Sequence, residues 1–97
     1  MRMMIKAQLD TVAAGDSIES GRMPQVMQHA MEQLKPEAAY FGPDGGKRTA
    51  FIVFDMQDPS QLPALTEPMF REFHANIEVF PVMNRDDLER GLSQLGG

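Results

Sequence analysis

The sequence contains no cysteine, and this absence excludes several kinds of chemistry. Without cysteine the chain has no disulfide framework, no thiolate nucleophile and no cysteine-ligated metal. Histidine is scarce too, since His29 and His74 are the only two, and neither has a partner at the spacing of a motif such as H-E-x-x-H. The sequence therefore predicts neither a metal site nor a bound cofactor.

Positive charge and long apolar runs are also in short supply. Nine Lys and Arg stand against 14 Asp and Glu, and the resulting net charge of −5 argues against binding to nucleic acid or to an anionic membrane. No stretch approaches the roughly 20 apolar residues of a membrane helix, and the first residues are charged too soon for a signal peptide. We expect a cytoplasmic protein whose 97 residues form a single domain.

Tryptophan is absent, whereas methionine occurs nine times. Methionine is flexible and fills irregular gaps, so this composition suits either a padded core or an adaptable ligand pocket. Met23, Met27 and Met31 recur at helical spacing, which places much of this methionine surface on one helix.

The stretch Thr49–Met56 is the longest run of β-branched and aromatic residues in the chain. Both of its alternating faces are apolar, with Phe51 and Val53 on one and Ile52 and Phe54 on the other. A strand with one wet face would alternate with polar residues. We therefore predict a central strand covered on both sides, which a chain of this length is not expected to achieve alone.

The rest of the pattern predicts six further elements. We expect strands at Met3–Leu9, Glu37–Phe41 and His74–Met83, and helices at Met23–Lys35, after Asp58 and after Asn84. Between these elements we expect a loop at Asp10–Gly21, with a helical turn near Asp16–Glu19, and a turn at Gly42–Gly46.

Proline and leucine positions refine these elements. Pro68 is expected to kink or break the second helix, because proline removes an internal hydrogen bond. Pro81 marks the last strand as an edge strand. Leu88, Leu92 and Leu95 are expected to form the buried stripe of the final helix.

The element order β-α-β-β-α-β, followed by a short helix, predicts an α+β ferredoxin-like fold with an antiparallel four-stranded sheet and helices on one face. The residues expected to face the helices are Ile5, Ala7, Leu9, Ile52, Phe54, Ile77 and Val79. The residues expected on the opposite face are Met4, Lys6, Gln8, Tyr40, Phe51, Val53, Asp55, Glu78 and Phe80. Phe51, Val53 and Phe80 are too apolar to remain wet as one patch, so we expect a homodimer in which two sheets pack face to face.

This architecture resembles the dimeric α+β barrel superfamily, which includes muconolactone isomerase, EthD-like proteins and the antibiotic biosynthesis monooxygenases. The resemblance covers nearly the whole chain in element order and carries no catalytic motif. It implies a dimer and a small-molecule cavity, either inside the barrel or between sheet and helices. It implies no particular reaction, because one fold hosts many functions.

Lys6, Asp55 and Glu78 form the sharpest candidate cluster on the open sheet face. The first strand is expected between the third and fourth, so Lys6 should meet one or both carboxylates. The cluster is interpreted either as an ion pair at a dimer seam or as a pocket in which a carboxylate base has a raised pKa.

Other side chains on or near the sheet could serve a ligand or a reaction. Tyr40 either packs against a helix or offers its hydroxyl to a ligand, and Phe51 is a further candidate for ligand binding. His74 is either an exposed connector or a general base at a cavity mouth, with Glu78 as the second candidate base. His29 is expected to be a solvated helix residue.

Three functions remain open at this point. The first is binding of a small hydrophobic molecule in a cavity lined by methionine and phenylalanine. The second is a cofactor-independent monooxygenase or isomerase acting on a small aromatic or carbonyl substrate. The third is a structural interaction domain. A filled interior favours the third function, a void of a few hundred cubic ångströms favours the first two, and a titratable side chain in that void favours the enzyme.

Overall fold

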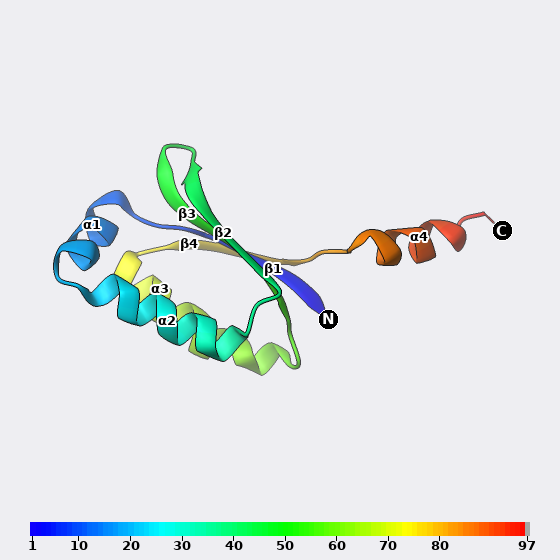
Figure 1. Cartoon of the computed structure of the whole chain (residues 1–97), viewed down its shortest axis with the longest axis horizontal. Helices are drawn as coiled ribbons and strands as arrows, with labels where there is room; N and C mark the ends of the chain where they lie inside the picture. Colours follow the sequence, from blue (N-terminus) through cyan, green and yellow to red (C-terminus); the bar gives the residue numbers. More distant parts are fainter. Residues whose placement is uncertain (97) are drawn as a thin grey trace.

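A computed structural model describes residues 1–96 and contains one antiparallel sheet in the order β2-β3-β1-β4 (Figure 1). The strands are β1 (Arg2–Gln8), β2 (Ala38–Asp44), β3 (Lys47–Asp55) and β4 (Asn76–Pro81). The α+β ferredoxin-like class predicted from the sequence is confirmed. The central position of β1 and β3 and the edge position of β4 are confirmed as well.

The strand register separates the two faces of the sheet as the sequence predicts. Lys6 lies opposite Phe51 on β3 and Glu78 on β4, whereas Ala7 lies opposite Ala50 and Ile77. Because successive side chains of a strand alternate between faces, these two rows belong to opposite sides of the sheet. One side is buried under helices, and the other lies open.

Helices cover the buried side of the sheet (Figure 1). They are α1 (Thr11–Glu19), α2 (Arg22–Leu34) and α3 (Leu62–Phe73), and α3 is preceded by the 3-10 turn η1 (Pro59–Gln61). The largest fully buried apolar side chains are those of Phe54, Phe73, Ile5, Ile52 and Met69. Removing this apolar surface from water holds the helices on the sheet.

The prediction of a loop at Asp10–Gly21 is wrong, because most of it forms α1. Asp10 caps the helix by accepting a hydrogen bond from the Ala13 amide at 3.0 Å. The residues that α1 buries are Ala14 and Ser17, whereas Val12 is exposed. A helix whose buried side is small and partly polar gives no apolar periodicity in the sequence.

Two proline-based expectations also need correction. Helix α3 runs without interruption through Pro68. The carbonyl that loses its donor belongs to Ala64, an exposed residue, so water can take the place of the missing amide. Strand β2 continues through Pro43 to Asp44, which reduces the predicted turn to Gly45 and Gly46.

The final helix, α4 (Arg85–Ser93), projects from the body of the molecule (Figure 1). Its Asn84 cap is as predicted and forms a capping box with Asp87. Its leucine stripe is not buried, because Leu88, Leu92 and Leu95 are 45%, 55% and 80% exposed. The spacing indicates an amphipathic helix correctly, but the other residues within 1–96 do not bury that stripe. Within residues 1–96, no helix is both long and apolar enough to cross a membrane.

Candidate ligand-binding cavity

A cavity of about 710 Å³ lies between the buried side of the sheet and the helices. Ala7 and Ala50 form its floor on β1 and β3, while Met23, Met27 and Met69 form its walls on α2 and α3. Its volume falls within the range of roughly 300–1,000 Å³ that is typical of small-molecule sites. Methionine walls suit such a site, because their flexible thioethers adapt to the shape of a bound molecule.

The floor of the cavity lies where two small side chains replace large ones on the buried side of the sheet. The directly opposed pairs of β1 and β3 are, in order, Met3 with Phe54, Ile5 with Ile52, and Ala7 with Ala50. The side chains of the first two pairs are buried in the core. At the Ala7–Ala50 pair the side chains end at Cβ, so the space beneath the helices stays open.

The mouth of the cavity lies where the β2–β3 hairpin approaches the start of α1. Its exposed lining residues lie there, namely Thr11, Phe41, Pro43, Gly46 and Arg48. The Arg48 Nη1 donates a hydrogen bond to the Thr11 carbonyl at 3.4 Å, which is a long contact. Among the described residues that line the cavity, Arg48 is the only charged one.

Four of the six predicted site residues form one row across the open face, on the far side of the sheet from this cavity. Tyr40, Phe51, Lys6 and Glu78 are successive neighbours across β2, β3, β1 and β4. The Lys6 ammonium lies 6.0 Å from the centroid of the Phe51 ring, which permits a cation–π contact. The open sheet face therefore gathers these side chains, but none of them lines the cavity.

The ion pair of Lys6 differs from the one the sequence suggested. Lys6 Nζ lies 2.8 Å from Oδ2 of Asp44, at the end of β2. This contact, with a smaller contribution from the charge of Glu78, raises the pKa of Lys6 above its ordinary value. Glu78 thus remains a neighbour of Lys6, whereas the closest carboxylate is one that sequence reasoning did not consider.

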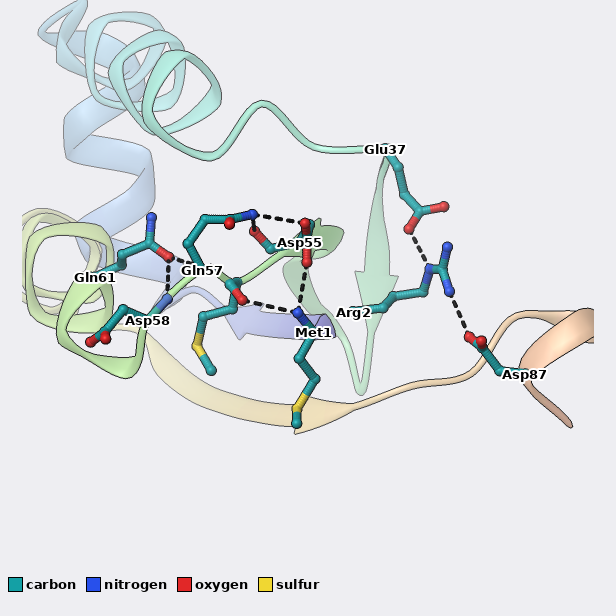
Figure 2. Close-up of polar contacts among 9 residues, drawn as sticks. Met1, Arg2, Glu37, Asp55, Gln57, Asp58, Gln61 and Asp87 are labelled. Atoms are coloured by element: carbon teal, nitrogen blue, oxygen red, sulfur yellow. Dashed lines mark hydrogen bonds and ion pairs between the residues drawn. The ribbon is translucent and has the colours of Figure 1, made fainter. Parts of the chain in front are cut away.

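Asp55 lies at the other end of the sheet, opposite Arg2 rather than Lys6 (Figure 2). Its carboxylate accepts hydrogen bonds from the Met1 amine and the Gln57 side chain, both at 2.7 Å. These two donors hold the pKa of Asp55 below its ordinary value. The structure therefore does not bring Asp55 together with Lys6.

The same end of the sheet anchors the projecting helix (Figure 2). Arg2 donates hydrogen bonds to Glu37, at 2.5 Å, and to Asp87 at the start of α4, at 2.7 Å. The Val82 amide also donates to the Arg2 carbonyl at 3.1 Å. These contacts fix the direction in which α4 leaves the body.

The two histidines and Glu78 lie outside the cavity lining. His74 is exposed and ends α3 in a left-handed conformation, with φ of 47° and its amide bonded to the Met69 carbonyl. His29 is exposed on α2, as predicted. Across residues 1–96, no three His, Asp or Glu side chains gather closely enough to hold a metal ion.

Sequence reasoning placed the methionines of α2 near a pocket but missed Arg48, Thr11 and the alanine floor. A signal for the floor is present in the sequence, because Ala7 and Ala50 are the smallest residues on otherwise bulky strand faces. Recognising it requires the register that sets these two residues opposite each other.

Comparison with known proteins adds a family but no chemistry. No curated protein matches the sequence significantly. Residues 1–96 match the model of a family described as a domain of unknown function, DUF3303. That match spans nearly the whole chain, and the protein therefore belongs to the DUF3303 family.

Proposed function

We propose that this protein binds a small hydrophobic molecule in the cavity between the sheet and the helices. The observation that carries the proposal is the 710 Å³ cavity with its alanine floor and methionine walls. An apolar molecule placed there would lose part of its contact with water, and each methylene group that becomes buried contributes about 0.8 kcal/mol. A purely structural domain would have no need for a void of this size.

An enzymatic role is supported less well by the same geometry. Acid–base catalysis needs a titratable group within hydrogen-bond reach of the substrate. The candidate bases His74 and Glu78 lie outside the cavity lining, and the described lining contains no histidine or carboxylate. Binding without turnover is therefore the function that the cavity favours.

We propose further that two copies pair through the open sheet face, as in the dimeric α+β barrel superfamily that the chain resembles. Phe51 and Phe80 lie on this face with no helix over them, and Phe80 is 40% exposed. The exposed leucine stripe of α4 is a second apolar surface without a cover. One two-fold partner would supply a cover for both surfaces.

The binding proposal is tested with N-phenylnaphthylamine, a neutral probe whose fluorescence rises in apolar surroundings. Wild-type protein is expected to enhance the fluorescence saturably. Ala7→Leu should abolish the enhancement, because the larger side chain fills the floor of the cavity. Ala38→Leu makes the same chemical change on the open face of β2 and should bind the probe like wild type.

Two results would contradict the proposal. One is a wild-type protein that leaves the fluorescence of the probe unchanged. The other is an Ala7→Leu protein that is folded, as judged by circular dichroism, and binds the probe as well as wild type does.

A further inference from the structure

We infer that the molecule bound in this cavity is an anionic amphiphile, with a carboxylate at Arg48 and an apolar tail over the Ala7–Ala50 floor. The inference rests on the proposed binding function and adds the chemical class of the ligand. It is carried by the distribution of charge and polarity along the cavity, from the mouth to the floor.

The Arg48 guanidinium is available to an anion because other residues of the chain accept few of its hydrogen bonds. In the part of the chain that the structure describes, its guanidinium forms no ion pair and makes one long hydrogen bond, to the Thr11 carbonyl. An arginine guanidinium presents five N–H donors in a planar fork that matches a carboxylate. Most of these donors are free for a ligand.

The surroundings of Arg48 are suited to an ion pair with one end of an apolar molecule. Phe41 and Pro43 line the same part of the cavity on β2, and Pro43 lies directly opposite Arg48 in the strand register. Apolar neighbours reduce access of water to a bound carboxylate and so strengthen its attraction to the guanidinium. Beyond this point Ala50 and Met69 contribute apolar surface to the lining.

The nearby start of α1 does not supply the anion site. Asp10 caps this helix, and its carboxylate already accepts a hydrogen bond from the Ala13 amide. A capping carboxylate offsets the positive end of the helix dipole. Arg48 is therefore the residue that would select an anion, and its contribution can be tested by substituting it alone.

The experiment compares decanoate with decanol, which share an apolar tail and differ in head-group charge, as competitors of N-phenylnaphthylamine. Wild-type protein should bind decanoate more tightly than decanol, by roughly tenfold, because a charge-assisted bidentate pair is among the stronger hydrogen-bonded contacts. Arg48→Gln should reduce this preference to near unity, and Arg48→Lys should retain part of it.

Lys47→Gln is the matched control. Lys47 precedes Arg48, is exposed and does not line the cavity, so its loss removes one positive charge and should leave the preference for decanoate intact. Equal decanoate and decanol affinities in wild type, or an unchanged preference in Arg48→Gln, would overturn the inference while leaving the cavity as a binding site. Failure of both competitors to displace the bound probe would likewise overturn only the inference, whereas a wild-type protein that does not bind the probe would overturn the proposed function as well.

Discussion

At the scale of single residues, the buried side of this protein is organised by a change in side-chain size. Ile5 and Ile52 pack tightly beneath the helices, whereas Ala7 and Ala50, two positions further along the same strands, leave a void. A few methyl groups thus separate a filled core from a cavity. An apolar cavity of this size supports the proposed site for another molecule.

A second residue-scale feature is the contact of α1 and α2 with α3 at Glu72. Its carboxylate accepts hydrogen bonds from the buried Ser17 hydroxyl, at 2.9 Å, and from Arg22, at 2.5 Å. These donors, Arg22 first, hold the pKa of Glu72 below its ordinary value of 4.5. The ionised carboxylate is therefore favoured more in the folded than in the unfolded protein.

This contact predicts a specific dependence of stability on pH. Because the folded pKa of Glu72 is lowered, its contribution to the free energy of unfolding is fully present above the ordinary pKa and is lost as pH falls through the folded pKa. Glu72→Gln should lower stability at neutral pH and flatten the acid limb of the curve. Urea denaturation from about pH 3 to about pH 7 measures both effects, because this range spans the titration of ordinary carboxyl groups.

The control for this prediction is Glu19→Gln, an exposed carboxylate at the end of α1. It should change neither the stability at neutral pH nor the shape of the acid limb. A Glu72→Gln protein whose pH profile parallels that of wild type would show that the contact contributes nothing to folding.

At the scale of elements, the strands and two of the helices follow from alternation and helical spacing alone, because their buried faces are large and apolar. Helix α1 does not follow, since it buries Ala14 and Ser17. The position of α4 outside the body of the molecule does not follow from the sequence pattern either. A leucine stripe at helical spacing predicts an apolar face but cannot say which surface covers it. The cavity likewise depends on strand register, a long-range property that local patterns do not contain.

The residue that ends α3 provides a prediction about stability. His74 ends α3 with a φ of 47°, a conformation that costs an ordinary residue about 1 kcal/mol or more and costs glycine little. His74→Gly should therefore raise the free energy of unfolding by about 1 kcal/mol. Chemical denaturation measures this change.

His29 offers the same substitution in a different setting. It is exposed in the interior of α2, where glycine is a poorer helix former than histidine. His29→Gly should therefore lower stability. If His74→Gly also lowers stability, the side chain of His74 has a role beyond ending the helix, and its candidacy as a functional residue gains weight.

At the scale of the whole molecule, a single chain leaves two apolar surfaces uncovered. The Cα radius of gyration is 15.4 Å, whereas a compact chain of this length has a value of about 12.5 Å. The excess comes from α4, which extends the molecule to 56 Å along its longest axis (Figure 1). A nine-residue helix is marginal in water by itself, which supports the proposed partner surface.

The proposed homodimer predicts the behaviour of a charge placed on the open sheet face. Phe51→Asp should convert a dimer into monomers or insoluble protein, because a carboxylate in an apolar seam loses its hydration. Light scattering coupled to size exclusion measures the mass. Phe70→Asp, the same change on the exposed side of α3, should remain dimeric. A stable dimer of the Phe51→Asp protein would show that copies pair elsewhere.

The central claim, that a small molecule occupies the cavity between sheet and helices, is tested most directly by the methionine methyl groups. The nine methionines are natural probes of different surfaces in an NMR spectrum of methyl-labelled protein. Met23, Met27 and Met69 line the cavity, whereas Met4 lies on the open sheet face. Titration with N-phenylnaphthylamine should shift the first three signals and leave Met4 in place. A shift confined to Met4, or no shift in the three cavity signals at saturation, would contradict the account.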